Sequence, residues 1–322
     1  MFIDAGLGSA TAGAAGALLG VLHAETRLAR RRIPEATEPP PVTHDTTWAA
    51  QGVGTLRPPI RIAMLGDSTA AGYGVHRDRD TPAAQIALGI SEAARRPVHV
   101  TNVAAVGAQS AQLPAQVAAL GRPRPDLAVI MVGANDVTAR NPPAEAVAHL
   151  ADAVGALLDL DCEVVVGTCP DLGTIRPLAQ PLRAYARRLS RQMARAQTVA
   201  AVGAGGRTVS LGDLLGPLFM KDLGYFSEDL FHPSAAGYER LARTLTPSVL
   251  AALGLGEDEE GTPREGRGEG VMPIGYAAAK ASHHPGTEID GTEVGGAKRG
   301  VGGRWVTLMR RRLLPTGGDA SG

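Results

Sequence analysis

The chain has 322 residues, its 32 basic and 32 acidic side chains leave no formal net charge, and aromatic residues make up only 3% of it. Balanced charge provides no excess that would attract the phosphates of nucleic acid, and so few aromatic rings leave few platforms on which bases stack. These properties predict a protein without a nucleic-acid partner.

The chain begins with an Ala- and Gly-rich stretch. Residues 5–24 carry no formal charge and are long enough to cross a bilayer as a helix, with Asp4 before them and arginines at 27, 30, 31 and 32 after them. If this segment inserts, the positive-inside rule leaves the rest of the chain in the cytoplasm, tethered to the inner face of the membrane. The alternative is a helix that packs on the domain or on a partner through its small residues. Residues 1–32 are thus predicted to form an N-terminal helix, and the proline-rich residues 33–59 a linker.

From residue 60 to about residue 254, short apolar runs alternate with helical patterns. Strands are expected at 60–65, 98–103, 127–132, 163–168 and 207–211, and helices at 82–94, 109–120, 143–160, 181–202 and 233–253. Several of these helices open with proline, which is favoured in the first turn. Five strands alternating with helices predict an α/β fold, a three-layer α/β/α sandwich around a five-stranded parallel, flavodoxin-like sheet.

Two cysteines, Cys162 and Cys169, bracket the expected strand at 163–168. Seven residues of extended chain span roughly 23 Å, whereas the Cα atoms of a disulfide lie within ~7 Å of each other. We therefore expect two free thiols, which favours a reducing compartment such as the cytoplasm, and no metal site built from them.

Residues 255–322 are rich in glycine and charge, and we expect them to be disordered to about residue 303. The end of the chain, residues 304–314, regains four apolar side chains beside three arginines. This pattern is typical of a short basic amphipathic helix for a membrane surface or a partner, with a tail of no functional consequence as the alternative.

The first expected strand ends in Gly66-Asp67-Ser68, a turn of small residues with a hydroxyl at its tip. In open α/β sheets, ligands bind at the carboxyl ends of the strands, so Ser68 lies where a nucleophile would be useful. Taken alone, however, Asp67 and Ser68 are more typical of a helix N-cap.

Three later stretches change this interpretation. Gly107 follows the second expected strand and Asn135 follows the third, within Gly133-Ala134-Asn135-Asp136; each alone is most often a turn residue. Asp229 precedes His232 by three residues, a spacing that lets the carboxylate reach Nδ1 while Nε2 faces a serine hydroxyl. A lone surface histidine would be the simpler interpretation if no serine turn preceded it.

Together, these blocks resemble those of the SGNH (GDSL-type) hydrolase superfamily of esterases and lipases, in the same order and spacing, over residues 60–253. The first block reads Gly-Asp-Ser-Thr rather than Gly-Asp-Ser-Leu, a variation that touches no catalytic atom. The resemblance implies a hydrolase of carboxylic esters or thioesters that works through an acyl-enzyme, with Ser68 as nucleophile, His232 as base and Asp229 as its partner. It also implies an oxyanion hole formed by Ser68, Gly107 and Asn135, and it requires no metal or organic cofactor.

Three other classes compete with this hypothesis. An α/β-hydrolase would carry its nucleophile in Gly-x-Ser-x-Gly, and the sequence contains no such pentapeptide. A flavodoxin-like binding module would share the sheet but would have no use for Asp229 and His232. A membrane-tethered scaffold would depend on its arginine-rich segments rather than on the serine site.

The residues just before His232 are unusually apolar. Four of the chain's 11 aromatic residues fall within residues 219–231: Phe219, Tyr225, Phe226 and Phe231. We predict that Phe219 and Phe226 line a pocket for an apolar acyl group, so that the substrate is a small-molecule or lipid-like ester. For Phe231 we favour a structural role, in which its ring fixes the Asp229 loop to the sheet.

Overall fold

The computed structural model describes residues 20–28, 31, 39–41 and 45–255, together with four short strands between residues 288 and 307. Most of the segment at 5–24 lies outside these residues, as does most of the tail beyond residue 255. Residues 20–28 are helical, and within the described part of the chain no helix has the length and apolar character needed to cross a membrane. Glu25 on this N-terminal helix accepts a hydrogen bond from the backbone N–H of Leu182 at 2.8 Å.

The central sheet contains the five expected strands, all parallel to one another. They are β2 (Ile60–Gly66), β3 (Val98–Asn102), β4 (Leu127–Met131), β5 (Glu163–Gly167) and β6 (Arg207–Val209). Their spatial order is β3-β2-β4-β5-β6. Among the five parallel strands this is the order 2-1-3-4-5 of flavodoxin-like folds. The predicted α/β fold with a parallel sheet is therefore confirmed.

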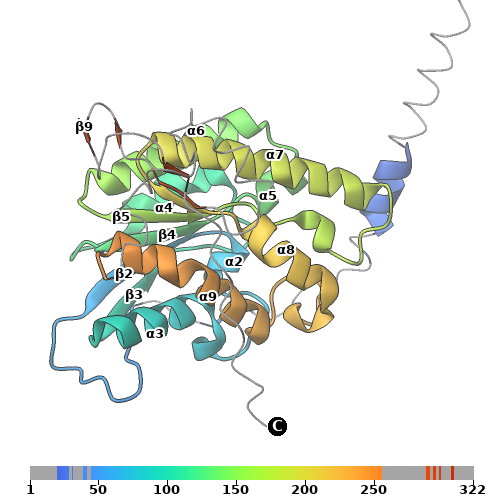
Figure 1. Ribbon diagram of the computed structural model, residues 1–322. Coiled ribbons are helices and arrows are strands. Elements are labelled where there is room, and N and C mark those ends of the chain that lie inside the picture. The colour runs from blue at the N-terminus through green and yellow to red at the C-terminus, as the bar shows by residue number, and fades with distance from the viewer. Residues whose placement is uncertain are drawn as a thin grey trace, which may run out of the picture.

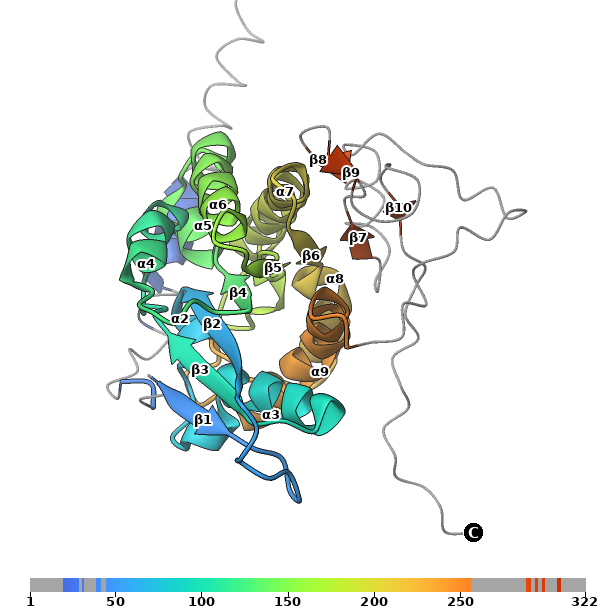
Figure 2. The same ribbon diagram turned by 90° about the vertical axis from the view of Figure 1, so that its left-hand side faces the viewer.

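Antiparallel strands extend the sheet at both edges (Figure 2). β1 (Thr46–Trp48) pairs with β3, although its residues belong to the stretch expected to be a linker. β7 (Glu288–Asp290) pairs with β6, and β10 (Val306–Thr307) pairs with β7, while β8 (Glu293–Val294) and β9 (Ala297–Lys298) form a separate pair. The sequence predicted none of these short strands, because a run of two or three residues carries too little periodicity to be recognised.

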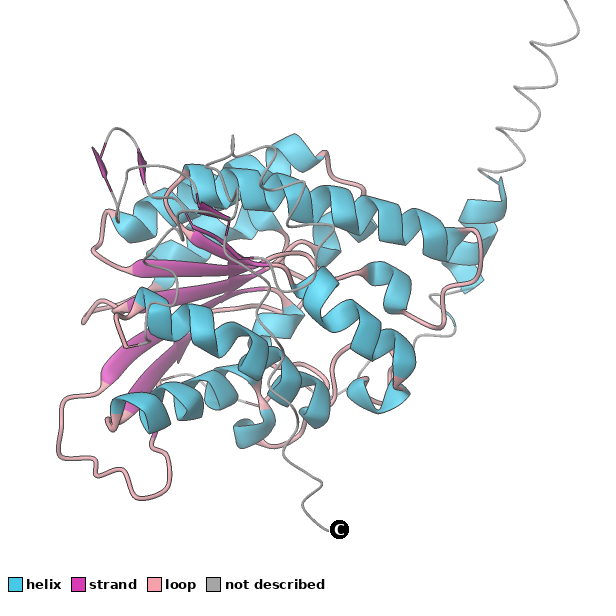
Figure 3. Ribbon diagram, in the orientation of Figure 1, coloured by secondary structure: helices cyan, strands magenta, loops and turns pink. Residues whose placement is uncertain are grey.

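Helices cover both faces of the sheet, as Figures 1 and 3 show. The helices of the domain are α2 (Ser68–Ala71), α3 (Pro82–Ala94), α4 (Leu113–Ala119), α5 (Ala134–Ala139), α6 (Pro143–Leu158), α7 (Leu182–Gly203), α8 (Leu211–Lys221) and α9 (Ala235–Ala252). Side chains of β2 alternate between the two cores: Ile62 and Met64 pack with α3 and α9, whereas Ala63 and Leu65 pack with α4 and α6. Burial on both faces is the reason why the central strand β4 is apolar throughout.

One expected strand is shorter than predicted. We expected residues 207–211 to be extended, but β6 ends at Val209, Ser210 is the N-cap residue of α8, and Leu211 is the first residue of that helix. Leu211, Leu215 and Phe219 recur every four residues and are buried, so they form the inward face of a helix. The expectation was wrong because Val209 and Leu211 also fit the alternation of a strand.

Candidate active site

The turn after β2 is held in place by a close backbone approach. Gly66 has φ +126°, and a Cβ atom there would lie 1.8 Å from the carbonyl oxygen of Met131 in the neighbouring strand. The backbone N–H of Asp67 donates to that same oxygen at 2.9 Å, and the Asp67 carboxylate accepts from the N–H of Thr69 at 2.9 Å. Asp67 is thus the N-cap residue of α2, and Ser68, which is 7% exposed, is its first residue.

The histidine and the two residues expected to work with it come together. His232 Nε2 lies 2.9 Å from Ser68 Oγ, and His232 Nδ1 lies 2.6 Å from Asp229 Oδ2. The Asp229 carboxylate is buried, and its Oδ1 atom accepts from the Ser227 hydroxyl at 2.7 Å and from the N–H groups of Phe231 and His232 at 2.8 Å each. Burial by itself would raise the pKa of Asp229, but the hydrogen bonds outweigh it and lower the pKa to about 2. The carboxylate is therefore ionised at neutral pH beside the imidazole.

The loop that carries this pair has a strained backbone. Leu230, between the acid and the histidine, has φ +55°, a conformation that branched residues rarely adopt. The two backbone N–H groups that donate to Asp229, those of Phe231 and His232, come directly after Leu230. The carboxylate therefore stabilises the same turn that positions the imidazole. The His232 ring also makes edge contacts with Tyr73 and Phe231, at centroid distances of 4.6 and 4.9 Å.

Of the expected oxyanion donors, Asn135 lines the same pocket as Ser68, whereas Gly107 lies on the loop after β3 and does not line it. Asn135 is in the first turn of α5, and its Nδ2 atom donates to the carbonyl oxygen of Ala108 at 2.9 Å, which ties it to the loop of Gly107. Gly107 has φ +80°, and a Cβ atom there would meet no other atom within 4 Å. An amide NH₂ group carries two donors, so the bond to Ala108 leaves the second one in a fixed direction.

Asp136, which the sequence motif contains but to which we assigned no role, joins these two loops. Its carboxylate is 1% exposed and accepts from the N–H and hydroxyl of Ser110 at 3.0 and 2.9 Å. It also accepts from Asn141 Nδ2 at 3.1 Å. Asp136 thus holds the Gly107 loop against α5, which fixes the position of Asn135.

Two glutamines support the site from inside helices. Gln116 on α4 accepts from the N–H of Gly66 at 2.7 Å and donates to its carbonyl oxygen at 2.9 Å, so it pairs both backbone groups before the nucleophile turn. Gln197 on α7 bridges the ends of two strands, because it accepts from the N–H of Cys169 at 2.7 Å and donates to the carbonyl of Val132 at 2.8 Å. Nothing in the local sequence distinguishes these glutamines from solvent-exposed ones.

An apolar pocket with a volume of about 80 Å³ opens beside Ser68 and His232. One wall comes from the segment after β5, with Leu172 and Ile175, and the other from α8 and the residues after it, with Leu215, Phe219 and Phe226. Both of the expected phenylalanines therefore line the pocket, and they also pack against each other with ring centroids 5.0 Å apart. Phe231, for which we expected only a structural role, lines the pocket as well.

The described residues contain no cluster of three or more His, Cys, Asp or Glu side chains that could hold a metal ion. Both cysteines are free and buried, at opposite ends of β5. Burial raises the pKa of the Cys162 thiol to about 12 and that of the Cys169 thiol well above its ordinary value, so neither is a reactive thiolate at neutral pH.

The chain is similar to known proteins over most of this domain. The chain matches the GDSL-like Lipase/Acylhydrolase family over residues 64–240, more than half of its length. It is 44% identical over 198 residues to GDSL-like esterase Rv1075c of Mycobacterium tuberculosis, a match that covers 60% of this chain and 63% of that protein.

Two solved structures are also similar. TesA is 22% identical, with a TM-score of 0.47 over 60% of this chain and 99% of its own. A mutant of Axe2, an acetyl-xylooligosaccharide esterase from Geobacillus stearothermophilus, is 19% identical, with a TM-score of 0.47 over 63% of this chain and 96% of its own. By the family match across residues 64–240, the chain belongs to the GDSL-like lipase/acylhydrolase family.

Proposed function

We propose that this protein is a serine esterase that hydrolyses carboxylic esters through an acyl-enzyme on Ser68. The observation that carries the proposal is the chain of two hydrogen bonds from Asp229 through His232 to Ser68, 2.6 and 2.9 Å long. A serine hydroxyl is a weak nucleophile unless a base takes its proton, and this arrangement places a base within reach and orients it.

In the first half-reaction, Ser68 Oγ forms a bond to the carbonyl carbon while His232 Nε2 takes the hydroxyl proton. The carbonyl oxygen becomes an oxyanion, and the N–H groups of Ser68 and Gly107 and the side chain of Asn135 stabilise it. When the tetrahedral intermediate collapses, the bond to the leaving group breaks and His232 returns the proton to the leaving oxygen or sulfur. Asp229 holds the tautomer in which Nε2 is free to accept.

In the second half-reaction, water takes the place of the alcohol. His232 removes a proton from water as the water oxygen attacks the acyl carbon, and the bond from that carbon to Ser68 Oγ breaks. The proton then returns to Ser68, and the carboxylic acid leaves. The proposed chemistry uses only side chains and backbone groups of the site.

The substrate side of the proposal follows from the pocket. Its volume of about 80 Å³ is well below the roughly 300 to 1,000 Å³ of pockets that bury drug-sized ligands. Each buried methylene contributes about 0.8 kcal/mol, so activity on simple esters should rise with acyl length until the pocket is full. An ester of a short apolar acyl group fits best, and acyl-CoA esters and acetylated sugars are the thioester and sugar-ester alternatives.

Fluorophosphonate labelling tests the nucleophile. The intact protein should gain one adduct, which peptide mapping places on Ser68, and Ser68→Ala should neither be labelled nor hydrolyse p-nitrophenyl esters. If the folded wild-type protein gains no adduct mass, the result would instead favour a binding module or scaffold. Such a protein would not use the hydrogen bonds among Ser68, His232 and Asp229 for catalysis.

We further propose a cytoplasmic location, with residues 5–24 as an optional tether to the inner face of the membrane. The two free, buried thiols support the location, because a reducing compartment keeps thiols unpaired. Fractionation of cells that produce the full chain or residues 33–322 tests it: a tether predicts that only the full chain sediments with membranes.

A further inference from the structure

The acyl pocket has two walls that come from different parts of the chain. The first wall is the segment after β5, where Asp171, η3 (Leu172–Thr174) and Ile175 line the pocket. The second wall is α8, whose Leu211, Leu215, Gly216 and Phe219 also line it.

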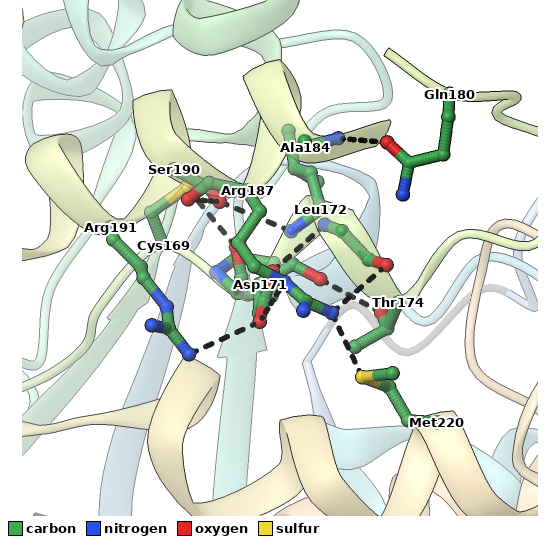
Figure 4. A network of polar contacts seen from close by, with 12 residues as sticks. Cys169, Asp171, Leu172, Thr174, Gln180, Ala184, Arg187, Ser190, Arg191 and Met220 are labelled. Carbon is green, nitrogen blue, oxygen red and sulfur yellow. Dashed lines mark hydrogen bonds and ion pairs between the residues drawn. The ribbon is translucent and has the colours of Figure 1, made fainter. Parts of the chain in front are cut away.

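Arg187 on α7 joins the two walls, although it does not line the pocket itself (Figure 4). Its Nε atom lies 3.3 and 3.2 Å from the two carboxylate oxygens of Asp171, and its Nη2 atom donates to the carbonyl of Gly173 at 3.2 Å. The same Nη2 atom lies 2.8 Å from the sulfur of Met220, which is on α8. One guanidinium therefore contacts both walls at once.

The packing around this guanidinium leaves little free space. A Cβ atom at Gly173 would lie 2.5 Å from Arg187 Nε and 2.9 Å from Asp171 Oδ1. On α8, a Cβ atom at Gly212 would lie 3.2 Å from the backbone N of Asp171, and one at Gly216 would lie 3.5 Å from its Cβ atom. Two glycines one turn apart on α8 thus let the helix approach the Asp171 segment closely.

Asp171 makes this junction sensitive to Arg187. Its side chain is only 5% exposed, so water contributes little to stabilising the carboxylate, and the groups that contact it do so instead. The N–H of Gly173 donates to Oδ1 at 2.8 Å, and Arg191 approaches Oδ2 at 3.8 Å. Arg187 is the group that contacts Asp171 and also reaches α8.

We propose that Arg187 is a positioning residue that sets the acyl-chain length which the enzyme accepts, by holding η3 and α8 together around the pocket. This inference rests on the proposed esterase function. It predicts that loss of the Arg187 contacts separates the walls and admits longer acyl groups, while the hydrogen bonds of Ser68, His232 and Asp229 stay intact.

The test compares four variants with the wild-type full-length protein. Arg187→Met keeps an aliphatic stem but removes the guanidinium, and Arg187→Lys keeps a charge that cannot contact Asp171, Gly173 and Met220 in the same planar arrangement. The double variant Asp171→Asn/Arg187→Met removes both charges, so no unpaired buried carboxylate remains to unfold the protein. Arg188→Met removes the neighbouring exposed arginine and is the matched control.

The measurements are kcat and KM for p-nitrophenyl acetate, butyrate and octanoate, together with the melting temperature. For Arg187→Met and the double variant, we expect the octanoate-to-acetate ratio of kcat/KM to rise by about fourfold for each extra methylene admitted. Arg187→Lys should give an intermediate ratio, and Arg188→Met should keep both the wild-type ratio and the wild-type kcat on acetate.

Two results would overturn the inference, and they are distinguishable. If the double variant is folded and active but its ratio equals that of the wild type, Arg187 has only a structural role and the proposed esterase function stands. If the wild-type protein shows no Ser68-dependent hydrolysis of any ester, the proposed function fails and this inference fails with it.

Discussion

His232 Nε2 lies 2.9 Å from Ser68 Oγ, although the two residues are 164 positions apart in the sequence. Ser68 stands at the end of the first parallel strand and His232 in the loop that leads into the last helix of the domain. Strand β2 carries Ser68 to the carboxyl edge of the sheet, and the loop before α9 brings His232 to the same place. The hydrogen bond between them is therefore a consequence of topology, and each partner can be changed without altering the strand order.

Asp229→Asn should lower kcat strongly while the protein remains folded. An amide can donate to His232 Nδ1, which favours the tautomer that carries its proton on Nε2 and cannot accept one from Ser68. A change of this type lowers kcat by about 10⁴-fold in the Ser-His-Asp proteases that serve as the reference case. Steady-state kinetics on p-nitrophenyl butyrate measure the loss, and a variant with turnover near wild type would show that Asp229 is only a loop residue.

Asn135→Ala removes one proposed oxyanion donor. We expect the barrier for ester hydrolysis to rise by about 3 to 4 kcal/mol, mainly through kcat, because the donor acts on charge that develops in the transition state. Asn141→Ala is the control, since Asn141 donates to Gln109 and Asp136 in the same pair of loops but does not line the pocket. Equal losses in both variants would assign Asn135 to loop structure alone.

The pocket can be made smaller without disturbing the fold. Gly216→Ala places a methyl group in ordinary contact with Asp171 and Thr174, which line the pocket, and alanine is favoured over glycine within a helix by about 1 kcal/mol. The variant should keep acetate turnover and lose activity on butyrate and longer esters, at equal or higher melting temperature. A uniform change across the ester series would show that the acyl group binds elsewhere.

The phenylalanines of the pocket need milder substitutions than alanine. Phe219 and Phe226 are 7% and 8% exposed and belong to the main apolar core, where truncation of such a ring to alanine costs about 3 to 5 kcal/mol of stability. Phe219→Leu and Phe226→Leu should instead keep the fold and change the preferred acyl length. Kinetics on acetate, butyrate and octanoate esters check this, and an unchanged length preference would remove both rings from substrate binding.

The free energy of unfolding should depend on pH through the buried carboxyl group of Asp67. Burial raises its pKa from 3.8 to about 6. Between pH 4 and 6, Asp67 therefore keeps its proton in the folded state but has lost it in the unfolded state. The stability that Asp67 contributes is complete below pH 4 and is lost as the pH rises through about 6, by on the order of 3 kcal/mol.

Asp67→Asn isolates this effect, because an amide oxygen can still accept from Thr69. Urea unfolding of the variant should lack the decline that the wild type shows between pH 4 and 6. Asp229 acts in the opposite direction: its lowered pKa of about 2 gives stability that is present above pH 4 and is lost as the pH falls toward 2. Parallel stability curves for wild type and Asp67→Asn from pH 4 to 7 would contradict the shift.

The sequence alone predicted the class of fold and the four segments of the site, around Ser68, Gly107, Asn135 and His232. Both predictions depend on local patterns. A strand that is buried on both faces is mostly apolar, and the small residues of Gly66-Asp67-Ser68 mark the end of this one, so Ile60–Gly66 and the turn at Ser68 could be predicted from the sequence. Asp229 and His232 could be predicted as a pair for a similar reason. They are three positions apart, which lets the carboxylate reach the imidazole within a single loop.

Tertiary structure decided the supports of the site and the shape of its pocket. Gln116 and Gln197 hydrogen-bond to backbone groups of Gly66 and Val132 at sequence separations of 50 and 65, and no local pattern marks such a contact. The same holds for Arg187, whose role comes from reaching Asp171 and Met220 on two other elements. Periodicity reports which face of an element is buried, whereas the identity of the group that it meets depends on how distant elements pack.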